Sequence, residues 1–232
     1  MNPQRWSARE RARELARHSL ARGDALGWFE QLYQEAASDP ARIPWADERG
    51  HPLLLEWLER TPRPAPGSRA LVIGCGLGED ARELAACGWT VTGFDVSPTA
   101  IEWCRRIPSP AGTSVNYLQA DLFAPPSNWN AAFELVFECY TLQALPARLR
   151  PEARRALASF LAPGGSLLVV TRAREPHEPE GELPWPLVRA EVEALRELGL
   201  AMREFGEFSS GPSEPPSRHF RARFERAPLS GS

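Results

Sequence analysis

Lysine is missing from the sequence, so all 27 basic residues are arginine. A chain without lysine cannot form a Schiff base through a lysine amine, and it cannot carry the lysine of a phosphate-binding P-loop. Neither sign of charge is in large excess, because the formal net charge is −3. This balance gives no overall attraction to nucleic acid or to an anionic membrane surface. We therefore expect a small-molecule partner, no nucleic acid and no membrane.

Cysteine is scarce, and long apolar runs are absent. The four cysteines form no CxxC pair and have no histidine at metal-ligand spacing, which predicts reduced thiols, no disulfide and no bound metal. No stretch approaches the ~20 apolar residues that cross a bilayer, and the charged N-terminus lacks the apolar core of a signal peptide. We therefore expect a cytoplasmic protein. A length of 232 residues fits one large α/β domain, as a monomer or a homodimer.

The N-terminal part of the chain is predicted to be helical. Three prolines interrupt residues 40–52, which predicts an extended loop that carries Trp45 and His51. Helices are predicted on either side of this loop, over residues 7–21, 24–37 and 53–59. Residues 1–60 should therefore form a helical cap that makes a single structural unit with a domain of residues 61–232.

From residue 70 onward, short apolar runs alternate with helical segments, which is typical of a parallel sheet. The expected parallel strands cover residues 70–73, 90–94, 115–119, 135–138 and 166–171. The expected helices cover residues 79–86, 98–106, 151–161 and 187–198. Two further alternating segments, 201–208 and 219–225, are joined by Ser, Gly and Pro and predict an antiparallel hairpin. The predicted fold is α/β, with a Rossmann-like, seven-stranded, mostly parallel sheet and helices on both faces. Residues 172–186, after the fifth strand, are predicted to form a substrate lid.

Three glycines at alternate positions follow the first predicted strand. Gly74, Gly76 and Gly78 allow a sharp turn and a close approach of the backbone to a ligand, and the next helix presents free N–H groups. Asp95 ends the second strand about 20 residues later, where a carboxylate can accept both hydroxyls of a ribose. The pattern predicts a site for a nucleoside-containing cofactor.

The spacing of these glycines favours one class of cofactor. Turns that bind a pyrophosphate usually follow GxGxxG, whereas this turn reads GxGxG and continues into Glu79 and Asp80. Acidic groups here would repel a diphosphate, but they are compatible with the sulfonium and ammonium of S-adenosylmethionine (SAM). An equally simple interpretation is that both acids stabilise the helix, because negative side chains at its N-terminus interact favourably with the helix dipole.

The run from Leu71 to Ile107 resembles motifs I and II of class I SAM-dependent methyltransferases. Within that superfamily, residues 88–101 are similar to the thiopurine S-methyltransferase and tellurite-resistance branch. Many relatives carry an acid just before the first glycine, where this chain has Ile73. The resemblance implies SAM as the cofactor. The residues expected to bind it are Trp45, Gly74, Cys75, Gly76, Gly78, Asp80, Asp95, Val96, Ser97, Asp121, Leu122 and Glu138.

The resemblance also implies roles for individual residues. Asp121 would lie near the adenine amino group, with Leu122 alongside, although Asp121 also suits a turn. The segment that contains Trp45 resembles one that folds over the cofactor, so residues 1–60 are expected to cover it. Residues 133–140 look like motif IV, whose end faces the sulfonium and the incoming nucleophile. The catalytic candidates there are Glu138, Tyr140 and His51.

The expected reaction is methyl transfer from SAM to a small molecule, and the branch resemblance favours a thiol, a selenol or another soft nucleophile. Trp185 is a further candidate for the wall of the acceptor pocket. The sequence shows no decisive general base. Three alternatives remain open at this point: a catalytically silent SAM-binding regulatory protein, an NAD-dependent oxidoreductase, and a methyltransferase that acts on RNA or protein.

Overall fold

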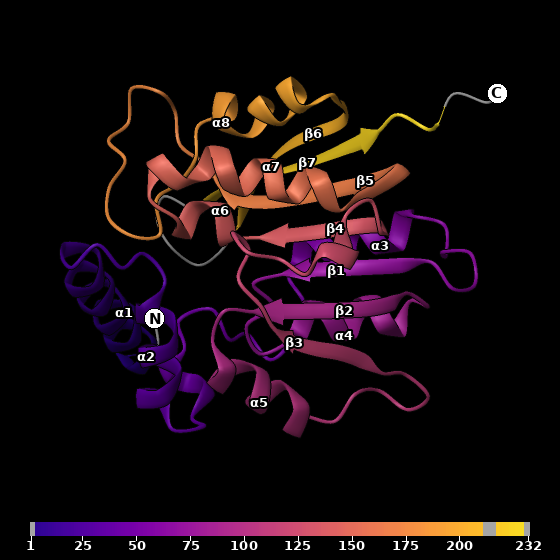
Figure 1. Ribbon diagram of the computed structural model, residues 1–232. Helices are drawn as coiled ribbons and strands as arrows, with labels where there is room; N and C mark the ends of the chain where they lie inside the picture. The colour runs from indigo at the N-terminus through magenta and orange to yellow at the C-terminus, as the bar shows by residue number, and fades with distance from the viewer. Residues whose placement is uncertain (1–2, 211–216, 230–232) are drawn as a thin grey trace.

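The computed structural model describes residues 3–210 and 217–229, and their core is a seven-stranded sheet (Figure 1). The strand order is β3-β2-β1-β4-β5-β7-β6. The parallel strands are β1 (Arg69–Ile73), β2 (Thr90–Asp95), β3 (Val115–Gln119), β4 (Phe133–Cys139) and β5 (Leu161–Arg172). Two antiparallel strands, β6 (Leu200–Ser210) and β7 (Ser217–Arg226), complete the sheet. The predicted fold class is confirmed, whereas the connection of the predicted hairpin, residues 211–216, lies outside the described residues.

Helices cover both faces of the sheet and its carboxyl edge (Figure 1). One face carries α6 (Thr141–Ala144), α7 (Arg150–Phe160), α8 (Arg189–Glu193) and the 3₁₀ turns η2 (Ser127–Trp129), η3 (Ala147–Leu149) and η4 (Ala194–Leu198). The other face carries α3 (Pro52–Arg60), α4 (Glu79–Ala86) and α5 (Pro98–Arg106). β1 is almost wholly buried between these layers. Because helices cover both of its faces, residues Ala70–Ile73 are all apolar and do not alternate with polar residues.

The N-terminal segment lies beside the carboxyl ends of the parallel strands (Figure 1). It contains α1 (Pro3–Ala21), α2 (Gly27–Ala36) and the 3₁₀ turn η1 (Pro40–Arg42). Its apolar cluster includes Trp28 and Tyr33 and extends into the domain through Leu77 and Trp103. The N-terminal helices therefore pack on the sheet domain, and their role as a cap over a cofactor stays a prediction. The exact division between residues 60 and 61 stays a prediction.

Two local predictions are wrong, and one short helix was missed. The helix expected over residues 187–198 is interrupted, because Leu187 forms a parallel bridge with Ala173, α8 begins at Arg189, and the chain tightens into η4. β5 begins at Leu161, which was expected to be helical, because Leu161 pairs with Phe133 before a shift in the register. The short helix α6, which follows β4, was not predicted at all.

No helix of the described chain has the length and apolar character needed to cross a membrane. All four cysteines are described, and all four are free thiols.

The glycine turn gives a test of the packing. Gly78 has φ of +78°, and a Cβ at this position would lie 2.3 Å from Tyr117 Oη. Gly199 has the same φ, but a Cβ there would meet nothing within 4 Å. Gly199→Ala should therefore cost only the strain of the left-handed backbone, about 1–2 kcal/mol. Gly78→Ala should lose roughly 1–3 kcal/mol more through the clash with Tyr117. Urea unfolding of both variants measures the difference, and equal losses would contradict the close packing at Gly78.

Candidate cofactor and acceptor site

The glycine turn connects β1 to α4 at the carboxyl edge of the sheet. Gly74, Gly76 and Gly78 all have positive φ, between 54° and 78°, which other residues adopt at a cost in energy. The turn is fixed from the sheet side, since Cys75 N donates to Phe94 O at 2.8 Å and Gly78 N donates to Cys75 O at 2.8 Å. The turn is thus a rigid backbone surface, with Gly74 itself exposed.

Asp95 ends β2 directly beside this turn. Its Oδ2 accepts from Gly76 N at 3.0 Å and its Oδ1 accepts from Ser97 N at 2.9 Å. The side chain is buried, and burial raises the pKa of its carboxyl to about 6. The N–H of Val96 also stabilises this carboxylate. Because a carboxylate offers about four acceptor sites, the side chain can still accept from a ligand.

A group of acids, Asp47, Glu79 and Asp80, lies on the other side of the turn. Asp80 Oδ1 accepts from His51 N at 2.7 Å, which holds the loop after Trp45 against the start of α4. Burial, followed by the charges of Glu79, Glu83 and Asp47, raises the pKa of Asp80 to about 7. Burial also raises the pKa of Glu79. The three acids thus destabilise one another, and a bound cation would relieve this repulsion.

The cap places two aromatic side chains over the turn. A Cβ at Gly76 would lie 3.2 Å from Tyr33 Oη and 3.5 Å from Trp45 Nε1. Trp45 Nε1 donates to Tyr33 Oη at 2.8 Å, so the two rings are fixed relative to each other. Trp45 thus lies beside the glycine turn, and its contact with a cofactor stays a prediction. Tyr33 was missed because its helical spacing is that of an ordinary core position.

The start of α5 links the cap to the end of β2. Glu30 of α2 accepts from Ser97 Oγ at 2.6 Å and from Thr99 Oγ1 at 2.7 Å. Ser97 is fully buried and also caps α5 by accepting from Ala100 N at 3.0 Å. Val96 is half-buried between Asp95 and this contact. Glu30 was missed by sequence reasoning, because one acid in an amphipathic helix carries no signal of its partner.

Asp121 and Leu122 follow β3 at the same edge of the sheet. Asp121 Oδ1 accepts from Phe123 N at 2.9 Å, which is a turn contact of the kind that its sequence position allowed. Leu122 is buried in the core cluster that includes Phe94. The structure thus brings these two residues to the sheet edge beside β2, and their contact with a cofactor stays a prediction.

Glu138 is completely buried near the end of β4. Its Oε1 accepts from Leu142 N at 2.9 Å, and among the described residues its Oε2 has no hydrogen-bond partner. Burial raises the pKa of Glu138 to about 7. In this conformation the carboxyl holds the first turn of α6, and its predicted catalytic and cofactor-binding roles stay predictions.

Tyr140 and His51 meet at the edge of the sheet. His51 Nε2 lies 2.9 Å from Tyr140 Oη, and Nδ1 accepts from Leu53 N at 3.2 Å. Burial, then the nearby His219, lowers the pKa of His51 to about 4, so the ring is neutral at neutral pH. The structure thus brings two of the three catalytic candidates together and adds His219, which sequence reasoning missed.

The segment after β5 packs against the cap. Arg13 Nε of α1 donates to Leu183 O at 2.9 Å, and Arg13 pairs with Glu182 at 3.2 Å. Trp185 N donates to Gln143 O at 2.9 Å, and the Trp185 ring lies under the Arg150 guanidinium at 6.0 Å. The predicted lid segment therefore touches both the cap and the residues after β4, while its movement stays a prediction.

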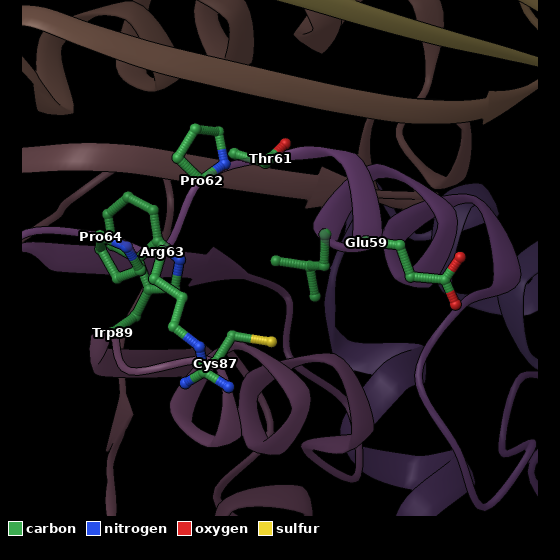
Figure 2. A pocket seen from close by; sticks show the side chains of 8 residues that line it. Glu59, Thr61, Pro62, Arg63, Pro64, Cys87 and Trp89 are labelled. Atoms are coloured by element: carbon green, nitrogen blue, oxygen red, sulfur yellow. The ribbon is translucent and has the colours of Figure 1, made fainter.

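A separate pocket lies at the opposite edge of the sheet, before β1 and β2. The cavity has a volume of about 250 Å³, and it is lined by the end of α3, by residues 61–64, by Cys87 and by Trp89 (Figure 2). Burial raises the pKa of the Cys87 thiol, which disfavours its reactive thiolate form. This pocket is remote from the glycine turn and has no part in the site described above.

Comparison with known proteins identifies the family. A model of the thiopurine S-methyltransferase family matches residues 31–223, which is most of the chain. The chain belongs to the thiopurine S-methyltransferase family. The resemblance drawn from the motifs is thereby confirmed.

Individual relatives are more distant. The chain is 28% identical over 148 residues to thiocyanate methyltransferase 1 of Brassica oleracea, which covers 62% of this chain and 61% of that protein. It is 27% identical to a 2-heptyl-1-hydroxyquinolin-4(1H)-one methyltransferase of Mycobacteroides abscessus, over 73% of each protein. An N-methyltransferase structure from Bradyrhizobium japonicum, in complex with S-adenosylhomocysteine (SAH), superposes with a TM-score of 0.62 at 22% identity, covering 84% of this chain and 96% of that one.

The buried carboxyl of Glu138 predicts a dependence of stability on pH. Its pKa in the folded protein is about 7, against an ordinary value of 4.5, so the folded state binds more protons between these values and becomes less stable as pH rises. Glu138→Gln keeps an acceptor for Leu142 N and removes the buried charge.

At pH 8 the variant should therefore be more stable than the wild type by at most about 3 kcal/mol, and it should melt at a higher temperature. This difference in stability should become smaller toward pH 5. Calorimetric melting of both proteins between pH 5 and pH 8 measures this difference in stability. A difference that does not change with pH would contradict the raised pKa.

Proposed function

We propose that this protein transfers a methyl group from SAM to a small-molecule acceptor, with a thiol, a selenol or another soft nucleophile as the favoured class. One observation carries the proposal. In a chain of the thiopurine S-methyltransferase family, the buried carboxylate of Asp95 lies against a glycine turn at the carboxyl ends of two adjacent strands.

The residues at the turn suit SAM in their charge and in their hydrogen-bonding groups. Asp95 would accept from the ribose hydroxyls, since its backbone donors do not use all of the roughly four acceptor sites of the carboxylate. Asp80 and its acidic neighbours would face the cationic ammonium and sulfonium. Val96, Asp121 and Leu122 would line the adenine side, and the turn contact of Asp121 Oδ1 leaves its second oxygen for the adenine amino group.

The cap would close the site. Trp45 and Tyr33 lie over Gly76, and His51 is tied by its backbone to Asp80. Such a cover excludes water and orients the bound groups, which suits a reaction whose acceleration comes largely from positioning.

When bound, SAM supplies an activated methyl group on a sulfonium that is an excellent leaving group. The chain's part is to hold the acceptor in line with that methyl group and, for a hydroxyl acceptor, to remove a proton. A soft nucleophile that is already ionised needs no base. This agrees with a site whose nearest histidine, His51, is a weak base with a pKa of about 4.

The family membership and the acids at the turn favour this function over an NAD-dependent oxidoreductase. A SAM-binding protein without catalytic activity would bind SAH equally well. An acceptor screen that starts with thiols distinguishes it from a methyltransferase, because only the enzyme would methylate an acceptor. We further propose a cytoplasmic location, no nucleic-acid partner, and a monomer or homodimer.

The ribose contact gives the first test. Asp95→Ala should weaken SAH binding by on the order of 1–3 kcal/mol, roughly 5- to 150-fold, because charge-assisted hydrogen bonds are lost. Isothermal titration calorimetry measures the affinity, with NAD as a second ligand that should not bind. Glu134→Ala is the matched control, since Glu134 is an exposed acid that accepts from Arg69 N at the far end of the sheet. Unchanged affinity in folded Asp95→Ala would refute the assignment.

The acids at the turn predict a dependence of SAM affinity on pH. Asp80 is half protonated near its pKa of about 7, and a bound cation favours its ionised form. Affinity for SAM should therefore fall as pH drops below 7, by at most about tenfold per pH unit. SAH lacks the sulfonium charge and should respond less. Asp80→Asn should make the affinity for SAM less dependent on pH. An unchanged dependence in this variant would show that the group that titrates is not Asp80.

A further inference from the structure

Four side chains from four parts of the fold meet on the acceptor side of the site. They are His51 from the cap, Tyr140 after β4, Arg172 at the end of β5, and His219 on β7. The rings of Tyr140 and His219 stack with centroids 6.0 Å apart, and His51 meets Tyr140 edge-on at 5.2 Å. Arg172 and His219 are partners in the β5–β7 register. Segments distant in sequence thus build one polar cluster.

The contacts of His51 fix the direction of its bond to Tyr140. Because Nδ1 accepts from Leu53 N, the hydrogen of the neutral ring lies on Nε2 and is donated to Tyr140 Oη. Tyr140 Oη is therefore an acceptor in this contact. Its own hydrogen is left to donate elsewhere.

Arg172 is a half-buried cation without a carboxylate partner in the described part of the chain. Its side chain donates to Ser217 Oγ at 3.3 Å, and the backbone N–H donates to Gln143 Oε1 at 2.6 Å. The charges of Arg9 and Arg13 add positive potential around it. A guanidinium in such surroundings favours an anion as its partner.

Tyr140 holds an unfavourable backbone conformation at this point. Its φ is 65° and its ψ is 2°, in the left-handed region that bulky residues rarely adopt. Such strain persists where the surroundings require it, and it often marks a functional position. Here it directs the ring toward His51 and His219 as the chain leaves β4.

Charge is divided across the site. Asp47 and Asp80 lie on the side of the glycine turn, and Arg172 lies on the other side. Tyr140 lies between them, because it follows β4, and β4 is placed between β1 and β5 in the sheet. The acidic side suits a cationic methyl donor, so the basic side is left for a group of the opposite sign.

We propose that Arg172 and the Tyr140 hydroxyl form an anion-binding subsite that takes the methyl acceptor in its ionised form, with His51 as the residue that positions the hydroxyl. The inference rests on the proposed methyl transfer and names the acceptor class: a small thiolate or a comparably polarisable anion. A lone pair of the anion forms the new bond to the methyl carbon, while the carbon–sulfur bond breaks and leaves its electron pair on the sulfur. No proton is transferred. The acceptor loses its negative charge when it is methylated, and the sulfonium of SAM becomes the neutral thioether of SAH.

The test uses the full-length protein saturated with SAH and two matched probes. 4-Nitrothiophenolate is an anion near neutral pH, and 4-nitrothioanisole has the same ring and sulfur without the charge. Arg172→Gln should weaken binding of the anion by roughly 10- to 100-fold. Binding of the thioether and of SAH should stay within about twofold, because neither contact involves the lost charge. Arg203→Gln, an exposed arginine of β6 paired with Glu225, is the control that should change nothing. Arg172→Met replaces Arg172→Gln if the latter does not fold.

The positioning role of His51 needs a separate readout. Asn is a good N-cap, so His51→Asn keeps an acceptor for Leu53 N while removing the reach to Tyr140. The visible absorption band of bound 4-nitrothiophenolate reports the hydrogen bond from Tyr140. Tyr140→Phe and His51→Asn should shift this band in the same direction, and the double variant should shift it no further than Tyr140→Phe alone. Additive shifts would assign His51 a role independent of the hydroxyl.

The outcomes separate the two proposals. Wild-type protein that binds SAH but not the anion, or Arg172→Gln that binds the anion as the wild type does, overturns the subsite and leaves the cofactor assignment intact. An equal loss for the anion and the thioether would also overturn it. Wild-type protein that does not bind SAH instead removes the proposed function itself.

Discussion

The backbone path from Gly74 to Gly78 is the constraint on which the rest of the site depends. Three glycines at positive φ turn the chain sharply from β1 into α4, and the turn is locked by neighbours that would collide with any added side chain. Its amide at Gly76 holds the Asp95 carboxylate, so the position of the second strand's last residue depends on the turn. A substitution that relaxed the turn would therefore disturb Asp95 and Asp80 together, on opposite sides of the same backbone.

The N-terminal cap contributes polar and aromatic side chains to the site, beside the glycine turn and Asp95 of the sheet domain. Glu30 binds the start of α5, Trp45 covers Gly76, and His51 is tied to Asp80 through its backbone and to Tyr140 through its ring. These contacts connect cap and domain by polar groups that converge on the ligand-binding edge, in addition to an apolar interface. The packing of the cap and the geometry of the site therefore depend on the same contacts, and a ligand bound there would stabilise both.

The repeating part of the fold and the cofactor end of the site could be predicted from the sequence, because both depend on local patterns. Alternating apolar runs specify strands, and the glycines with Asp95 form a motif of fixed spacing. The break at Leu187 could not be predicted, since a tertiary bridge to Ala173 overrides an otherwise helical period. Glu30, Arg172 and His219 were missed for a related reason: each owes its place to a partner remote in sequence. A signal for Arg172 did exist, because a charged residue that ends a buried parallel strand faces the ligand edge.

The site carries acids beside the glycine turn and an arginine, Arg172, at the end of β5. This division of charge explains why methyl transfer here needs few other polar groups. Burial and the charges of nearby acids raise the pKa of Asp80 and favour a cation beside it, while Arg172 has no carboxylate partner among the described residues and favours an anion. Opposite charges held a short distance apart attract strongly where water is excluded, so the protein needs to supply alignment rather than acid–base chemistry. Transfer of the methyl group neutralises both partners at once. The same acids and arginine that favour binding of the charged reactants then hold the products less tightly, which couples the chemical step to product release.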